Sequence, residues 1–168
     1  MILVVGLGVT GEAVATRLST DGPVTVVDDR PDSPSFAERA PRLADRGVTV
    51  VGGPTPEQLA ELVAAAELVV PSPGVPEAHP VYRLAAEAGA PLHSEIELAG
   101  TAAEARALPL VAVTGTNGKT TVTTLIAEML SAGGKRSLAA GNIGRPLLDA
   151  VHDEDVDVLV AEVSSFQL

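Results

Sequence analysis

The chain has 168 residues, a length that suits one ordinary domain or two small ones. Its formal net charge of −11 argues against a nucleic-acid partner, because binding to a phosphate backbone needs a basic surface. The lack of cysteine excludes disulfides, and without an apolar run near the roughly 20 residues of a membrane span or a charged leader we expect a cytoplasmic protein with no membrane partner.

Short runs rich in valine and leucine alternate with stretches rich in alanine, leucine and glutamate. The short runs lack polar–apolar alternation, which is typical of parallel strands buried on both faces. They predict strands at 2–5, 24–28, 49–51, 68–70, 110–114 and 156–162, with a short one near 137–140. The stretches between them predict helices at 12–19, 36–46, 57–66, 81–88, 120–132 and 145–151. This alternation indicates an α/β fold built on parallel sheets.

The strand–helix pattern restarts after residue 107, which divides the chain into two α/β parts. We expect a Rossmann-like domain over residues 1–92 and a helix with a linker over 93–107. Residues 108–168 would then form a second, incomplete α/β unit that carries a P-loop-like turn. Because this second part offers few strands and stops directly after an apolar run, we expect the chain to be the N-terminal part of a longer protein.

The first predicted strand runs into Gly6-Leu7-Gly8-Val9-Thr10-Gly11, which fits the pattern G-x-G-x-x-G before a helix. Such a turn lets the backbone approach a pyrophosphate closely. Asp28 and Asp29 end the second strand, near the position of the acidic residue that binds a ribose in dinucleotide-binding proteins. By themselves these residues favour NAD(P) or FAD, or a glycine turn that serves helix–sheet packing alone.

A proline-rich loop, residues 71–76, follows the fourth predicted strand. Ligands of open parallel sheets bind beyond the carboxyl ends of the strands, so this loop should share an edge with Gly8 and Asp28. An ordinary turn stiffened by proline explains it equally well. The histidines at 79, 93 and 152 have no metal-ligand spacing, and we expect them on the surface or in loops.

A second glycine turn, Gly115-Thr116-Asn117-Gly118, joins an apolar strand to a helix that Lys119 and Thr120 open. Backbone N–H groups of such a turn and of the helix N-terminus point at an anion, and the lysine adds a positive charge. The threonine hydroxyl can bind Mg²⁺. Val113 stands where a strict Walker A motif has glycine, but the order of elements still favours a nucleotide phosphate.

Two polar residues follow apolar runs in the second part of the chain. Glu162 stands at the end of the strand predicted at 156–162, where an acid holds Mg²⁺ in P-loop enzymes. An isolated charge within an apolar run is costly unless it is paired, which favours a functional role. Asn142 lies in the turn 141–144, where its amide could donate to a phosphate oxygen or simply cap a helix.

The segments 6–11, 28–30, 72–75, 114–121, 141–144 and 162–168, in this order, resemble the Mur ligase family, the ATP-dependent amino-acid-adding enzymes of peptidoglycan synthesis. The family's own version of the P-loop accounts for Val113. The last five residues, Ser-Ser-Phe-Gln-Leu, are most similar to the branch that adds D-glutamate. The resemblance covers the whole chain, but only the N-terminal domain and the front of the central domain of the family.

The resemblance implies a role for each matching residue. It implies that the first unit binds the UDP of a substrate instead of NAD, through Val9, Thr10, Asp28, Asp29, Arg30 and Gly74, and that Asn142 and Ser164 also contact the substrate. It implies ATP binding by Gly115, Thr116, Asn117, Gly118, Lys119, Thr120 and Thr121. Lys119 and Glu162 would be catalytic, and Thr120 and Glu162 would hold Mg²⁺. Asp29 departs from the threonine that some members carry, and Arg30 is suited to lie flat on a base ring.

The implied reaction activates a carboxylate. The γ-phosphoryl group of ATP passes to the L-alanine carboxylate of UDP-N-acetylmuramoyl-L-alanine, and the amine of D-glutamate displaces phosphate from the acyl phosphate. Lys119 and Mg²⁺ would neutralise the crowded anions. Because further family residues should lie beyond Leu168, we expect this chain, as a monomer, not to complete the ligation alone. An NAD(P)-dependent oxidoreductase and a non-enzymatic nucleotide-binding module are the alternatives.

Overall fold

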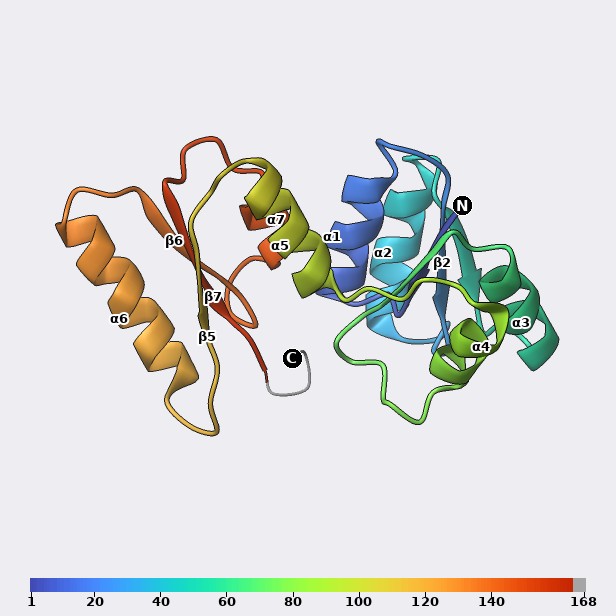
Figure 1. Ribbon diagram of the computed structural model, residues 1–168. Coiled ribbons are helices and arrows are strands. Elements are labelled where there is room, and N and C mark those ends of the chain that lie inside the picture. Colours follow the sequence, from blue (N-terminus) through green and yellow to red (C-terminus); the bar gives the residue numbers. More distant parts are fainter. Residues whose placement is uncertain (165–168) are drawn as a thin grey trace. The chain divides into compact units, whose positions relative to one another are not determined.

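The computed structural model describes residues 1–164, which form two compact units, Met1–Glu95 and a second that begins at Ile96. Each unit has its own sheet of parallel strands with helices packed on it (Figure 1). This confirms the predicted α/β class. Within the described residues no helix is both long enough and apolar enough to cross a bilayer. Of the predicted family segment that ends the chain, residues 165–168 lie outside the described part.

The first unit is a four-stranded parallel sheet in the order β3-β2-β1-β4. Its helices α1 and α2 lie on one face, and α3 and α4 lie on the other (Figure 1). Since β1 has β2 on one side and β4 on the other, the carboxyl ends of these three strands meet at one edge. The elements are β1 Ile2–Val5, α1 Val9–Leu18, β2 Val24–Asp28, α2 Pro34–Ala44, β3 Thr49–Gly52, α3 Pro56–Ala64, β4 Leu68–Pro71 and α4 Pro80–Ala88.

The buried core of this unit is built mainly from aliphatic side chains. Alternate residues of the central strands, among them Leu3 and Val5, point toward α3 and α4 and are fully or almost fully buried. They pack against Leu59 and Val63 of α3 and against Val81 of α4. Each such side chain stabilises the fold by about 1.5–3 kcal/mol relative to an exposed position. This packing fixes the sheet that carries the loops described below.

Three helices of the first unit begin with the same device, a polar N-cap followed by proline at the first helical position. The side chains of Ser33, Thr55 and His79 accept hydrogen bonds from the backbone N–H groups of Phe36, Gln58 and Val81. A backbone N–H at the first helical position has no partner within the helix. Proline, which lacks this N–H, therefore loses no hydrogen bond there. These helices therefore start one or two residues before their predicted positions.

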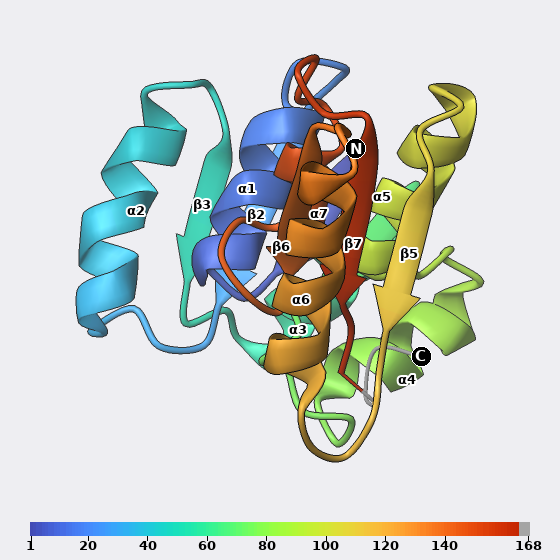
Figure 2. The ribbon, with the colours of Figure 1, turned by 90° about the vertical axis from the view of Figure 1, so that its left-hand side faces the viewer.

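The second unit is a three-stranded parallel sheet in the order β5-β7-β6, and β7 is buried along its whole length. Helix α6 lies along this sheet (Figure 2). The register sets Glu162 of β7 beside Val113 of β5 and Gly141 of β6. The elements are α5 Glu95–Ala105, β5 Leu110–Val113, α6 Lys119–Ala132, β6 Ser137–Gly141, α7 Leu147–Ala150 and β7 Val158–Glu162. The strand predicted near 137–140 is thus confirmed.

Candidate functional site

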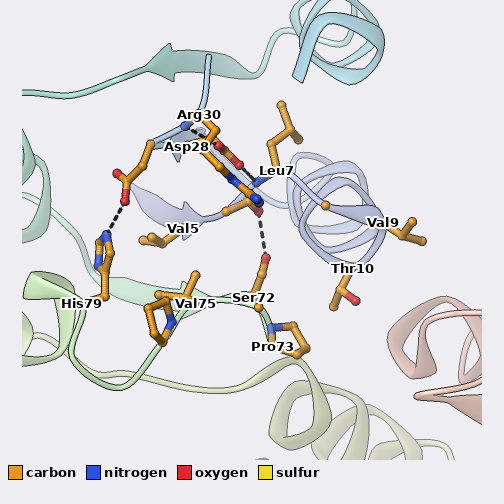
Figure 3. A pocket seen from close by; sticks show the side chains of 15 residues that line it. Val5, Leu7, Val9, Thr10, Asp28, Arg30, Ser72, Pro73, Val75 and His79 are labelled. Atoms are coloured by element: carbon orange, nitrogen blue, oxygen red, sulfur yellow. Dashed lines mark hydrogen bonds and ion pairs between the residues drawn. The ribbon is translucent and has the colours of Figure 1, made fainter. Parts of the chain in front are cut away.

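A cavity of about 590 Å³ opens at the carboxyl edge of the first sheet, where β1, β2 and β4 end (Figure 3). The glycine turn, the end of β2 and the loop after β4 form its walls, so the proline-rich loop shares an edge with the glycine turn as predicted. The predicted substrate residues that line the cavity are Val9, Thr10, Asp28, Asp29, Arg30 and Gly74.

Side chains from three parts of the unit fix the glycine turn. The buried Asp28 carboxylate accepts hydrogen bonds from Leu7 N at 2.6 Å and from Arg30 N at 2.8 Å. The Ser72 hydroxyl donates to the Gly6 carbonyl at 2.8 Å, and the Ser35 hydroxyl donates to the Leu7 carbonyl at 2.9 Å. The dashed line from Ser72 in Figure 3 marks its bond to this turn. Each oxygen of the Asp28 carboxylate therefore accepts a hydrogen bond from a backbone N–H group.

Gly11 allows the turn to pack tightly against the start of α1. A Cβ atom at Gly11 would lie 2.0 Å from the Gly6 carbonyl oxygen and 2.8 Å from Ser72 Oγ. Helix α1 has Gly8 at its N-cap and no side-chain cap. The first N–H groups of a helix have no partners within it, and their dipoles favour an anion. The tight turn thus forms a site suited to a phosphate or diphosphate group at the cavity wall.

His79 lies in the loop directly before α4, as predicted, and it also lines the same cavity, which the sequence did not indicate. Its side chain is 9% exposed, caps α4 and lines the cavity opposite the glycine turn. Nε2 lies 3.0 Å from an Asp29 carboxylate oxygen, and the dashed line from His79 in Figure 3 marks this contact. The pair His79-Pro80 before an apolar helix was the available signal, because proline at the first helical position identifies the preceding residue as a cap.

Tyr82 supports the loop that follows β4. Its hydroxyl donates to the Val75 carbonyl at 3.4 Å. Burial raises the pKa of Tyr82, and the negative charge of Glu77 adds to the shift. The hydroxyl therefore stays protonated and remains a donor to the cavity wall at any ordinary pH.

The second glycine turn has a different environment. Residues 114–118 are exposed, and α6 begins at Lys119 directly after them. Gly118, the N-cap, has φ +75°, a left-handed conformation that favours glycine. The Lys119 ammonium donates to the Gly115 carbonyl at 2.8 Å, so its charge already lies over the turn. A phosphate placed here would meet the helix N-terminus and the lysine together.

Thr120 and Glu162 are 42 positions apart in the sequence, and their side chains are in contact. The Thr120 hydroxyl donates to a Glu162 carboxylate oxygen at 2.8 Å, and Glu162 is 5% exposed. Asn142 N donates to the Glu162 carbonyl at 2.9 Å, which brings the turn after β6 to the same place. The predicted substrate residues Asn142 and Ser164 thus belong to the second unit, the latter two residues after Glu162.

The donor atoms in this second unit fit Mg²⁺. A hydroxyl and a carboxylate are oxygen ligands, and Mg²⁺ in nucleotide sites takes one or two protein ligands together with phosphates and waters. No cluster of three or more histidine, cysteine, aspartate or glutamate residues that could hold a metal occurs in residues 1–164. Thr120 and Glu162 would therefore hold Mg²⁺ together with further ligands such as phosphate oxygens and waters.

Comparison with known protein families gives two matches along the chain. Residues 1–94 match the model of the Mur ligase MurD-like N-terminal domain, and residues 113–168 match the Mur ligase middle domain. UDP-N-acetylmuramoylalanine–D-glutamate ligases from Desulfatibacillum aliphaticivorans and Trichlorobacter lovleyi are 45% and 46% identical over 168 and 166 residues. These alignments cover 99% and 98% of the chain and 36% of each relative, so the chain spans about a third of their length.

Solved structures agree on the fold. The pseudomurein peptide ligase type C from Methanothermus fervidus aligns with a TM-score of 0.53 and 26% identity, over 99% of this chain and 33% of its own. UDP-N-acetylmuramate-alanine ligase MurC from Thermotoga maritima aligns with a TM-score of 0.53 and 24% identity, over 97% of this chain and 36% of its own. The chain therefore belongs to the Mur ligase family, with an N-terminal domain of the MurD-like type.

Proposed function

We propose that the protein is an ATP-dependent ligase that adds D-glutamate to UDP-N-acetylmuramoyl-L-alanine through an acyl phosphate. The observation that carries the proposal is the identity of 45% to D-glutamate ligases over the whole chain. In this proposal the first unit binds the UDP portion and the second unit binds ATP. The 168 residues alone do not complete the reaction, in keeping with the third of the relatives' length that they span. The protein works as a monomer in the cytoplasm.

The first-unit cavity supports UDP binding through two features. The N-terminus of α1, with Val9 and Thr10, offers backbone N–H groups to the diphosphate. Asp29 and Arg30 at the end of β2 are exposed and reach the uridine, with the planar guanidinium against the base. Asp28 holds the turn that presents these groups. In the alternative of an NAD(P)-dependent oxidoreductase, the carboxylates at the end of β2 would face a ribose. The identity to D-glutamate ligases favours the ligase over this alternative.

The second unit supports ATP binding at the turn 115–121. Lys119 moves from the Gly115 carbonyl to the β- and γ-phosphates, while the N–H groups at the start of α6 bind the same anion. Thr120 and Glu162 hold Mg²⁺, which supplies positive charge against the phosphate oxygens. The buried Glu162 keeps the Thr120 hydroxyl in place before a ligand arrives. Lys119 stabilises the charge that develops as the γ-phosphoryl group leaves ADP.

The proposed reaction has two steps. The carboxylate oxygen of the substrate attacks the γ-phosphorus of ATP, the bond to ADP breaks, and an acyl phosphate forms. The amine of D-glutamate then attacks the carbonyl carbon, phosphate leaves, and the amine loses a proton as the amide forms. Phosphorylation is needed because a carboxylate oxygen is a poor leaving group. Asn142 and Ser164 contact the substrate beside Glu162.

Calorimetric titration of the 168-residue chain with UDP, with NADH and with ATP plus Mg²⁺ tests the binding roles. We expect UDP to bind and NADH not to bind. The variant Lys119→Ala should lower ATP affinity and leave UDP affinity unchanged. Lys135→Ala is the matched control, because Lys135 is the chain's other lysine and follows the opposite end of α6. Tight NADH binding without a UDP response would refute the proposed substrate.

Activity is tested in a chain extended to the length of its relatives. Supplied with UDP-N-acetylmuramoyl-L-alanine, ATP, Mg²⁺ and several candidate amino acids in turn, it should release phosphate only with D-glutamate. Lys119→Ala should lower the rate by about a hundredfold or more, since it removes a charge that stabilises the transition state. Phosphate release with a different amino acid would retain the family and overturn the proposed acceptor.

A further inference from the structure

His79 stands at the start of α4 and uses both ring nitrogens. Nδ1 accepts from Val81 N at 3.2 Å, so Nδ1 carries no proton in this arrangement. In the neutral ring the proton is then on Nε2, which donates to Asp29 Oδ2 at 3.0 Å. The imidazole thus ties the end of β2 to the start of α4, two elements that are 50 residues apart in the sequence.

Capping alone does not call for histidine. In the same unit Ser33 caps α2 and Thr55 caps α3, each through one side-chain oxygen and each before a proline. Such residues are the preferred N-caps, whereas the second nitrogen of histidine adds nothing to a cap. What distinguishes the third cap is its contact with Asp29. The nearly buried imidazole therefore has a partner that serine or threonine could not reach.

The Asp29 carboxylate can accept further hydrogen bonds besides the one from His79. Its side chain is 59% exposed and lines the cavity, while His79 occupies one of the lone pairs of a carboxylate that can accept several hydrogen bonds. The two residues also line a second cavity of about 240 Å³, whose other walls include Pro54, Pro56 and Leu59. The pair therefore forms part of the wall of both cavities.

We propose that His79 is a positioning residue for the substrate site: it holds the Asp29 carboxylate in the cavity wall, where a free oxygen accepts an N–H or O–H of the bound nucleoside. The inference rests on the proposed function for the identity of the ligand as a uridine nucleotide. A carboxylate that is free to rotate would lose entropy when it binds the ligand, and the imidazole removes part of that cost before binding. His79 acts through Asp29 and need not touch the ligand itself.

Calorimetric titration of the whole chain with UDP tests this through four proteins: wild type, His79→Asn, Asp29→Ala and the double variant. Asparagine is a preferred N-cap, so His79→Asn keeps a cap for α4 and loses the contact with Asp29. We expect His79→Asn and Asp29→Ala each to weaken UDP binding by about tenfold, the effect of one hydrogen bond to a charged group. The double variant should bind no more weakly than Asp29→Ala. Thr55→Ala, which removes a cap without lining the larger cavity, should bind UDP like wild type.

Wild-type affinity in His79→Asn, or additive losses in the double variant, would overturn the positioning role and reduce His79 to a helix cap. A wild-type chain that does not bind UDP would remove the proposed function together with this inference. If a variant fails to fold, the arrangement of His79 can still be tested on the wild-type chain without a ligand. Nitrogen NMR of the wild-type imidazole at mildly alkaline pH should show the proton of His79 on Nε2, and a proton on Nδ1 would contradict the arrangement.

Discussion

The two glycine turns of this chain are alike in sequence context and different in how they are held. Each follows a parallel strand and opens a helix. The turn at 6–11 is fixed by Asp28, Ser72 and Ser35, which come from other parts of its unit. The turn at 115–118 is exposed, and the bond from Lys119 to the Gly115 carbonyl comes from its own helix.

The difference separates a preformed site from one that a ligand completes. Hydrogen bonds from β2, from α2 and from the loop after β4 hold the first turn whether or not an anion is present, so little ordering is left for binding. In the second turn the lysine must leave a backbone carbonyl to reach a phosphate. We infer that the first unit recognises its ligand with a rigid surface, whereas the second rearranges when it binds.

The largest expected effect comes from adding a methyl group to each turn. Gly11→Ala should destabilise the first unit by about 3 kcal/mol, because its Cβ would clash with the Gly6 carbonyl, which cannot move away. Gly118→Ala should cost about 1 kcal/mol, the strain of a left-handed alanine, since nothing lies within 4 Å of the added Cβ.

Urea unfolding measures both variants. Tyr82 is the only tyrosine and the chain has no tryptophan, so intrinsic fluorescence reports on the first unit alone. Far-UV circular dichroism follows both units together. Equal losses in the two variants would mean that the first turn is no more tightly packed than the second.

A smaller effect should distinguish the two buried carboxylates. Asp28→Asn should destabilise the first unit by about 2 kcal/mol, because a single amide oxygen cannot accept from both Leu7 N and Arg30 N. Glu162→Gln should change stability by about 0.5 kcal/mol or less, since a glutamine oxygen can still accept from Thr120. It should instead weaken the binding of ATP with Mg²⁺. Unchanged ATP binding in Glu162→Gln would argue against the metal role.

The smallest expected effect is on the pH dependence of stability, and it involves an ion pair outside both turns. Hydrogen bonds from the side chain and backbone of Arg136 lower the pKa of Asp157 from 3.8 to about 2. Because the folded-state pKa is the lower one, this pair stabilises the second unit fully above pH 3.8 and ceases to do so as the pH falls through about 2.

Thermal unfolding of Asp157→Asn and wild type across this range tests the linkage. The gap in Tm between them should be constant above pH 3.8 and close toward pH 2. Asp155→Asn is the control, because Asp155 contacts the same arginine at 3.2 Å but remains almost fully exposed. A gap in Tm that does not change with pH would contradict a lowered pKa for Asp157.

Local sequence was sufficient for much of this description. Short apolar runs predicted the strands β1–β7 of residues 1–164, and the glycines at 6–11 and 115–118 predicted the two turns. The ends of helices were less certain, because the caps at Ser33, Thr55 and His79 lie outside the apolar periodicity that marks a helix. The role of His79 escaped prediction for the same reason.

Residue patterns along the chain were enough to predict the two α/β units, the positions of both glycine turns and the presence of Lys119 at the start of a helix. They did not predict that Asp28 binds Leu7, that Ser72 binds Gly6 or that His79 binds Asp29. These contacts join residues that are 21, 66 and 50 positions apart. They exist because the strand order places β2 and β4 on either side of β1, and the pairing of strands depends on packing across the whole sheet, which no local pattern encodes.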